Sequence, residues 1–534
     1  MLAPVPAPNA AEQRITAKVL AGPIRFLADD ALEGRGPGTR GDQLARLYIA
    51  SMMESLGLRP GGPDGGWEQP FELLGITGTA PARWTFASGR ERLDLVNQHD
   101  FVAVSGVQTA RAVVESAEVV FVGYGIQAPE YGWDDFKEAD LRGKVLLMLN
   151  NDPDWDPDLF AGKRRLYYGR WTYKYESAAR QGAAGAIIVH TTESAGYPWQ
   201  TVQTSWSGEN SRLPSDHGPE LQVQGWVTEE AARRLVALSG HDLPALVASA
   251  RQRAFVPVPL GVTTSIRLEN RLRRYQTANV LGVLPGRDPL LREQCVVYTA
   301  HHDHLGAKKG KDGAVAIYNG AVDNASGVAQ LLAVARAFQA LPEPPRRSVL
   351  FLAVAAEEQG LLGSAYYAAH PTVAPGRMVA NLNFDGANIW GRTRDVPAVG
   401  FGKSTLDQVA AAAAARQGRT LVDEQFPERG SFYRSDQFNF AKLGIPALYL
   451  AVGSDFIGRP KGWGREQVEA WIERHYHQPS DDLDAGWNFD AMVENARLGF
   501  AIGWTVAESA TMPAWRPGDE FEPARQRALE GLTR

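Results

Sequence analysis

The sequence predicts an α/β fold: a mixed sheet with a mostly parallel core between helices, and a β-rich domain inserted into it. Three apolar runs between residues 295 and 385 have the length and composition of buried strands. Residues 325–341, between the first two runs, have helical periodicity, which gives the order strand, helix, strand. Each run ends in a cluster of His, Asp or Glu, where open α/β sheets bind their ligands.

Bulk composition excludes several classes of protein. A chain of 534 residues is too long for one ordinary core, so two or more domains are expected. The net charge of −6 and the lack of a long basic run argue against a nucleic-acid partner. No run approaches the roughly 18 apolar residues of a membrane span. The single cysteine, Cys295, excludes an intrachain disulfide and a cysteine-based zinc site.

The first residues, MLAPVPAPNAAEQ, lack the basic and apolar regions of a signal peptide. Their Ala/Pro composition is like the spacer left after signal removal, with an added Met in front. We therefore expect a periplasmic or extracellular protein, and a native cytosolic start is the alternative.

A change of composition in the middle of the chain sets the predicted domains. There, short β-like runs such as VVFVGYGI and KVLLMLN alternate with loops rich in Trp, Tyr and Gly. We predict that residues 1–115 and 266–534 form the main domain and that residues 116–265 form the insert, with a sheet of its own. The acidic run Asp152–Asp158 is a candidate calcium site, although alternating acids and prolines are more typical of a solvated loop.

The remaining elements follow from periodicity and capping residues. A helix is expected over 12–32, then a glycine-rich break at 34–41, and then a second helix with Asp42 as its N-cap and Gly57 at its end. After residue 271 the pattern predicts strands at 277–286 and 445–453, helices at 404–416, 435–444 and 489–509, and a loop at 475–484.

The polar clusters that follow the strands suggest metal chemistry only when they are taken together. Singly, Asp323 reads as a helix cap, Glu357 and Glu358 as a solvated pair, Asp385 as a turn residue and His477 as a loop residue. Together with His301 they supply the nitrogen and oxygen ligands that zinc prefers. A pair of zinc ions needs a bridging carboxylate and terminal ligands on each side.

Two further features of the clusters suit catalysis. Of two adjacent glutamates, one can bind metal while its neighbour takes a proton from the water that bridges the two ions. Asp303, two residues after His301, is placed to orient that histidine, as metal-binding histidines usually require.

The series AHHD, VDNASG, AEEQGLLGS, NFD and YHQPSDD resembles the M28 family of zinc metallopeptidases, over residues 271–510. FYRSDQFNFAKLGIPALYL and ALEGRGPGTRG also resemble members of this family. The middle of the chain is similar to the protease-associated domain inserted in some members, on VGYGI, LRGKVLLML and QGAAGAIIVH.

The resemblance implies two Zn²⁺ per chain and a role for each motif residue. His301 and Asp385 would bind one ion, Glu358 and His477 the other, and Asp323 would bridge them. Glu357 would be the general base, and Tyr476 would hydrogen-bond the tetrahedral oxyanion. A cis peptide bond is expected between Asp323 and Asn324. Gln437 departs from the histidine of many relatives, whereas His302, His304 and His475 match no ligand and are expected to be structural.

The resemblance implies an enzyme that removes N-terminal residues from peptides. A site rich in carboxylates favours the ammonium group of a peptide, whereas a substrate carboxylate would need a cationic clamp, for which Arg434 and Arg429 are the candidates. The alternatives are a carboxypeptidase or dipeptidase, a glutaminyl cyclase, and a non-catalytic receptor. The intact ligand set counts against the receptor.

Overall fold

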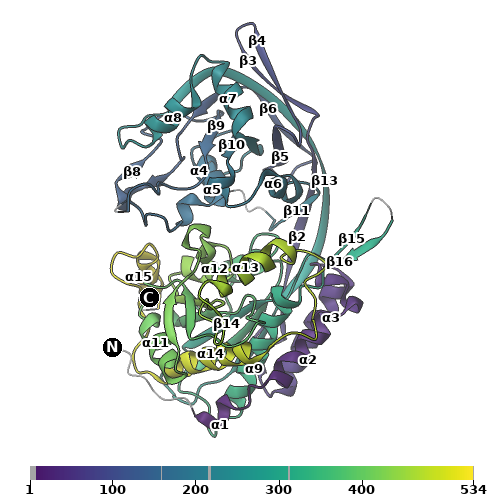
Figure 1. Ribbon diagram of the computed structural model, residues 1–534, viewed down its shortest axis with the longest axis vertical. Helices are drawn as coiled ribbons and strands as arrows, with labels where there is room; N and C mark the ends of the chain where they lie inside the picture. Colours follow the sequence, from purple (N-terminus) through teal and green to yellow (C-terminus); the bar gives the residue numbers. More distant parts are fainter. Residues whose placement is uncertain (1–7, 158, 215–217, 311–312, 533–534) are drawn as a thin grey trace. The chain divides into compact units, whose positions relative to one another are not determined.

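The computed structural model describes residues 8–157, 159–214, 218–310 and 313–532 (Figure 1). The chain divides into two compact units. The first comprises Met1–Glu72, Gln276–Gln425 and Arg434–Arg534, and the second Leu73–Tyr275 with Phe426–Tyr433. Among the described residues, no helix is both long enough and apolar enough to cross a membrane.

The boundaries of the second unit differ from the predicted insert at 116–265, and strand pairing explains the difference. Strands β3 (Arg83–Ser88) and β5 (Phe101–Ser105) lie before residue 116, yet they pair with β13 and β12 of the second unit. At the other end, β13 (Val258–Leu284) stays paired with β6 (Arg111–Phe121) as far as Glu269, so the change of unit comes later than residue 266.

The first unit is built on a mixed sheet whose central strands are parallel. Its strand order is β1 (Arg59–Pro60), β13, β17 (Ser348–Val354), β14 (Cys295–His301), β18 (Met378–Asn383), β21 (Ala447–Leu450), β19 (Asp395–Val399) and β20 (Thr420–Asp423). Strands β17, β14, β18 and β21 run parallel to their neighbours in this series, whereas β13 and β19 join them antiparallel. The predicted mixed sheet with a parallel core is therefore confirmed.

Helices cover both faces of this sheet, as its alternating side chains require. Val296, Tyr298 and Ala300 of β14 pack into one core, together with helices α2 (Ala17–Leu27), α9 (Ser326–Gln339), α11 (Leu406–Arg416) and α14 (Asp490–Glu508). Cys295 and Val297 pack into the opposite core, with α10 (Leu362–Ala369) and α12 (Gln437–Lys442). Because both faces are covered, β14, β17 and β18 are buried throughout and mostly apolar.

The N-terminal helices differ in detail from the prediction. The helix expected over 12–32 is divided into α1 (Asn9–Glu12), α2 and a 3₁₀ segment, η1 (Asp30–Arg35). Helix α3 (Arg40–Ser55) is capped by Thr39 rather than by Asp42: the Thr39 hydroxyl accepts from the Asp42 N–H. Asp42 is fully buried in the first turn, where its carboxylate accepts from Gly38 N and from the Thr277 hydroxyl.

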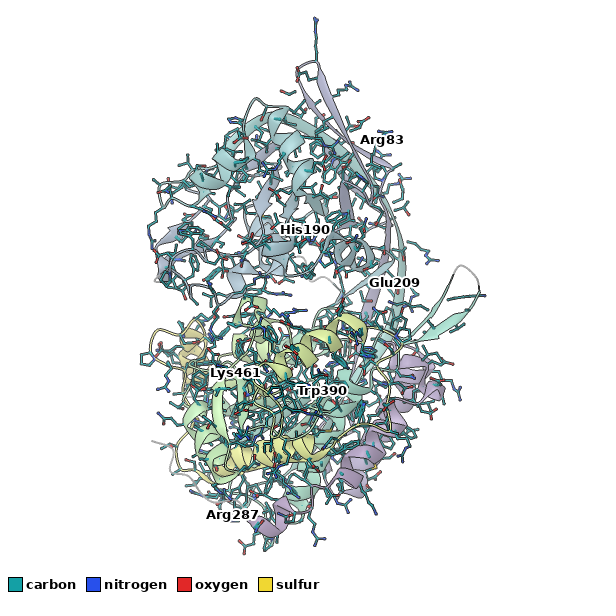
Figure 2. The ribbon with its side chains drawn as sticks, in the orientation of Figure 1. Arg83, His190, Glu209, Arg287, Trp390 and Lys461 are labelled. Atoms are coloured by element: carbon teal, nitrogen blue, oxygen red, sulfur yellow. The ribbon has the colours of Figure 1, made fainter. Side chains whose placement is uncertain are left out.

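The second unit has its own parallel strands, and it also carries helices. Strands β6, β9 (Val145–Leu149), β10 (Gly185–His190) and β12 (Val223–Thr228) pair parallel in that order, and His190 at the end of β10 is labelled in Figure 2. The expectation of a separate sheet is wrong at β13. This strand pairs with β6 in its first half and with β17 in its second, so it is shared by both sets of strands.

A buried lysine holds the loops of the second unit together. Lys174, on α4 (Trp171–Arg180), is fully buried, and its ammonium donates to Tyr124 O at 2.6 Å and to Asn151 O at 2.7 Å. Burial raises the pKa of Asp152 and of Asp135 to about 7, and the charge of Lys174 opposes that rise. Asp152 is therefore buried and is not part of a solvated loop. The cation next to this acidic run is the ammonium group of Lys174, which binds the nearby carbonyls. Asp158, the last residue of the run, lies outside the described residues.

Replacement of Lys174 with Met should destabilise the second unit by about 3–5 kcal/mol, because two buried carbonyls lose their donor and two buried acids lose their cation. Burial lowers the pKa of Lys174 to about 7, so the loss should be measured at pH 6, where its ammonium is charged. Urea unfolding measures it, with exposed Lys163→Met as the control. A loss no larger than that of the control would contradict the prediction.

Candidate metal centre

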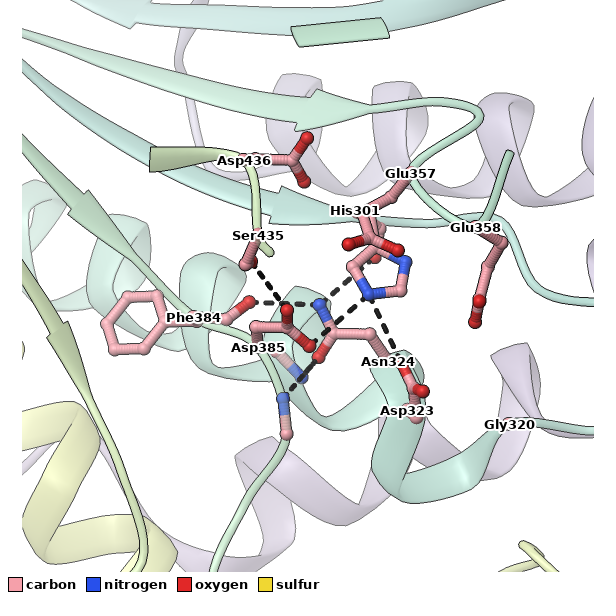
Figure 3. Close-up of polar contacts among 12 residues, drawn as sticks. His301, Gly320, Asp323, Asn324, Glu357, Glu358, Phe384, Asp385, Ser435 and Asp436 are labelled. Atoms are coloured by element: carbon pink, nitrogen blue, oxygen red, sulfur yellow. Dashed lines mark hydrogen bonds and ion pairs between the residues drawn. The ribbon is translucent and has the colours of Figure 1, made fainter. Parts of the chain in front are cut away.

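Three neighbouring strands bring the predicted metal residues to one edge of the sheet (Figure 3). His301 is the last residue of β14, Glu357 and Glu358 follow β17, and Asp385 follows β18. Asp323 lies in a short irregular segment, Ala321–Ala325, which leads directly into α9. The parallel direction of β14, β17 and β18 places their carboxyl ends together, which is where open α/β sheets carry their sites.

Asp323 stands at the centre of the cluster. Its Oδ1 lies 3.2 Å from His301 Nε2, and its Oδ2 lies 3.2 Å from His477 Nε2. His301 Nε2 also lies 3.4 Å from Asp385 Oδ1, and His477 Nε2 lies 3.1 Å from Glu358 Oε2. The five residues proposed as ligands are thus adjacent, and the two oxygens of Asp323 face two different histidines.

The donor set fits a divalent cation of the zinc type. The ligand atoms of His301, Asp323 and Asp385 all lie within 4.8 Å of one another, and so do those of His304, Asp323 and Glu358. Burial acts to raise the pKa of Asp323, but hydrogen bonds from His301 and His477 hold it well below its usual range. Crowded, ionised carboxylates beside imidazole nitrogens are the ligands that zinc selects.

The two adjacent glutamates have opposite electrostatic surroundings. Burial raises the pKa of Glu357 well above its usual value, and the charges of Asp385 and Glu358 add to the rise. Burial also acts on Glu358, but the charges of His477 and His304 lower its pKa to about 2. Neighbouring carboxyls whose pKa values are pushed apart are typical of sites in which one acts as a base and the other as a fixed anion.

Asp303 contacts the site differently from the expectation. Its carboxylate lies 3.8 Å from His301 Nδ1, beyond hydrogen-bond distance, and the Asp303 carbonyl at 3.2 Å is the nearer partner. The carboxylate instead accepts from the backbone N–H groups of Glu357 at 3.1 Å and Glu358 at 3.4 Å. Asp303 therefore positions the glutamate pair through its side chain and His301 through its backbone.

Several neighbours of the site were missed by the sequence analysis. Asp481 accepts from Val322 N at 2.9 Å and from Asp323 N at 3.0 Å, and the Ser435 hydroxyl donates to Asp385 Oδ2 at 2.5 Å. His304, expected to be structural, has its Nδ1 2.6 Å from Glu358 Oε1. Its position three residues after His301 was the signal that could have drawn attention to it.

The remaining predicted residues have clear local surroundings. The Tyr476 ring stacks on the His477 ring, with centroids 3.8 Å apart, and burial raises the pKa of its phenol to about 12. The peptide bond between Asp323 and Asn324 is cis, as expected. Gln437 accepts from Asn383 Nδ2 at 2.8 Å. His302 Nε2 lies 3.2 Å from Asp42 Oδ1 and His475 Nδ1 lies 3.0 Å from Ser480 Oγ, and neither histidine is among the grouped candidate ligands of the described residues.

The chain is similar in sequence to known peptidases. The chain is 28% identical to aminopeptidase YwaD of Bacillus subtilis over 379 residues, which are 67% of this chain and 63% of that enzyme. It is 28% identical to leupeptin-inactivating enzyme 1 of Streptomyces exfoliatus over 249 residues, which are 46% of this chain and 51% of that enzyme. Each alignment thus spans less than two thirds of the relative's length.

The fold has a match among solved structures. The aminopeptidase from Aneurinibacillus sp. strain AM-1 superimposes with a TM-score of 0.54 and 21% identity, over 94% of this chain and 97% of that one. The model of the family described as "Peptidase family M28" matches residues 279–501, which contain the five residues proposed as ligands. Over residues 279–501 the chain therefore matches peptidase family M28.

Proposed function

We propose that the chain is a zinc-dependent exopeptidase that removes N-terminal residues from peptides. The observation that carries this proposal is the position of Asp323, whose two oxygens face His301 and His477 at 3.2 Å each. A carboxylate shared in this way is the arrangement that a two-metal site requires.

His301 and Asp385 would hold one Zn²⁺, Glu358 and His477 the second, and Asp323 both. Bound there, zinc would act as a Lewis acid that polarises the scissile carbonyl and makes water a better nucleophile. The nitrogen and carboxylate donors of this set are those of known catalytic zinc sites.

Glu357 would be the general base that takes a proton from the attacking water and passes it to the leaving amine. Its backbone is held by Asp303, and one of its carboxylate oxygens lies within 4.8 Å of ligand atoms of His301 and Glu358. Tyr476, with its phenol kept protonated, would donate to the oxyanion of the tetrahedral intermediate.

The carboxyl groups of the site support cleavage at the N-terminus. Those of Asp385, Glu358 and Glu357 offer oxygen acceptors for the ammonium group of a peptide, which is largely charged at neutral pH. Arg429, one of the two candidate clamps for a carboxylate, stacks on the Phe426 ring with its guanidinium carbon 3.8 Å from the ring centroid. We also propose that the second unit is a protease-associated domain and that the enzyme acts in the periplasm or outside the cell.

The assignment predicts that an aminoacyl arylamide is hydrolysed at least tenfold faster than its N-acetylated form. A chelator should abolish the reaction, and added Zn²⁺ should restore it. Measured rates on the two arylamides test the choice directly. Preference for the blocked substrate would favour the carboxypeptidase reading. Cyclisation of N-terminal glutamine to pyroglutamate, with release of ammonia, would favour glutaminyl cyclase.

Glu357→Gln should keep the zinc content of the protein and lower kcat by about a hundredfold or more, because the side chain keeps its shape and loses its basicity. Glu358→Gln should instead lower the zinc content. Elemental analysis and steady-state kinetics on both variants separate the two roles. Turnover of Glu357→Gln within a few-fold of the parent would show that Glu357 is not the base.

Asp303→Asn should reduce kcat by about tenfold, because the amide offers one acceptor oxygen where two N–H donors need two. A matched control is Asp395→Asn: Asp395 also accepts from two consecutive N–H groups, those of Ser454 and Asp455. Both changes should lower stability by about 1–3 kcal/mol. If kcat fell equally in the two variants, the hydrogen bonds from Glu357 N and Glu358 N to the Asp303 carboxylate would have no specific role in turnover.

A further inference from the structure

Arg35 is a buried cation that the catalytic assignment leaves unexplained. It ends η1, and its side chain is fully buried. Its Nε donates to His302 O at 2.8 Å, its Nη1 donates to Asn319 O at 2.5 Å and to Leu27 O, and its Nη2 donates to Gly320 O at 3.0 Å. The guanidinium thus binds four backbone carbonyls from three separate segments.

Two of those segments carry proposed zinc ligands. His302 follows His301 directly, and Gly320 precedes Asp323 by three residues. His301 Nε2 also lies 3.2 Å from Asp323 Oδ1. The two segments are therefore linked at two places, through the guanidinium of Arg35 and through this contact at the centre of the site. The planar fork of arginine fixes the directions of its donors, so it sets the spacing of the carbonyls that it binds.

The backbone around Arg35 fits tightly between the same segments. Gly34 has φ +69, and a Cβ at that position would lie 2.5 Å from Tyr318 O and 2.6 Å from Gly306 O. Gly306 N donates to Gly34 O at 3.1 Å, and Tyr318 N donates to Gly306 O at 3.1 Å. The N-terminal segment is therefore wedged between the chain that follows His301 and the chain that precedes Asp323.

The charge of Arg35 also acts on the site. Burial lowers its pKa to about 10, and the nearby carboxylates of Asp303, Asp481, Asp323 and Glu358 oppose that fall. The group therefore remains a cation at neutral pH. Its bonds go to neutral carbonyls, so its charge is left to offset the carboxylates of Asp303 and Asp481, which hold the backbone of the proposed ligands.

We propose that Arg35 is a positioning residue that fixes the distance between His301 and Asp323 and so sets the zinc affinity of the centre. This inference rests on the proposed function, because it concerns the same zinc ions. Loss of groups that orient metal ligands typically costs 10–100-fold in metal affinity. Lysine cannot replace Arg35, because an ammonium has three N–H donors whereas the guanidinium of Arg35 donates to four carbonyls.

A second buried arginine provides a matched control for loss of stability. Arg347 is 1% exposed and donates to Gln294 Oε1, to Val506 O and to Ser509 O, none of which belongs to the candidate site. Arg35→Gln and Arg347→Gln should therefore lower the melting temperature to a similar degree. Arg35→Gln loses bonds to segments that carry proposed ligands, whereas Arg347→Gln loses bonds to segments that carry none.

The test is competition for Zn²⁺ between the protein and a fluorescent chelator, with circular dichroism as the check on folding. Arg35→Gln and Arg35→Lys should bind Zn²⁺ at least tenfold more weakly than the parent, and Arg347→Gln within twofold of it. Gly34→Ala, which keeps Arg35, should also weaken binding, because its Cβ pushes the same two segments apart. This variant keeps the inference testable if the Arg35 variants do not fold.

The outcomes separate the two proposals. A parent protein that binds no Zn²⁺ overturns the proposed function and this inference with it. A parent that binds Zn²⁺ while Arg35→Lys, Arg35→Gln and Gly34→Ala bind it equally well overturns this inference alone. An equal loss in Arg347→Gln also overturns it, because affinity would then follow general stability.

Discussion

Carboxylates crowded at one edge of a sheet repel one another, and much of the first unit serves to hold them there. Asp323, Glu358 and Asp385 lie close to His301 and His477. Each of the three is also held by a hydrogen bond to a residue outside this group. Asp481 accepts from the backbone N–H of Asp323, the Ser435 hydroxyl donates to Asp385, and Asp303 accepts from the N–H of Glu358. Ionised groups can stay close in a protein interior only when such donors, or a cation, stabilise their charge.

The strands that can be predicted from the sequence are those in which every residue is buried. β14, β17 and β18 are covered on both faces, so they are buried throughout and mostly apolar, and this pattern identifies them. The burial of β13 is not uniform: residues 258–269 alternate between buried and more exposed positions, residues 271–274 are exposed, and residues 277–284 are buried apart from Val283. From sequence, this single strand is interpreted as two. The predicted boundary between the insert and the main domain, at residues 265 and 266, therefore falls inside the strand. Thr39 and Asp42 are both good capping residues, and sequence alone cannot decide between them.

The residues of the site divide in a similar way. His301, Asp323, Glu357, Glu358, Asp385 and His477 were found because metal-binding residue types stand at strand ends and in a familiar order. Arg35 and Asp481 bind backbone groups, and a backbone group leaves no signature in the sequence. Arg35 lies 267 positions from His302, so only the folded chain brings the two together. The same limit applies to Asp303, whose carboxylate holds two N–H groups where its spacing suggested contact with a histidine ring.

The exposure of the proposed ligands indicates how a substrate reaches them. The side chain of His301 is 1% exposed and that of Asp323 11%, whereas those of Asp385 and His477 are 20% and 33% exposed. The centre is thus closed on the side of His301 and Asp303 and open on the side of Asp385 and His477. Tyr476, stacked on His477, stands on that open side, where a peptide carbonyl would arrive. The anchored side fixes the ligands, and the open side is the one from which a substrate of the proposed enzyme would enter.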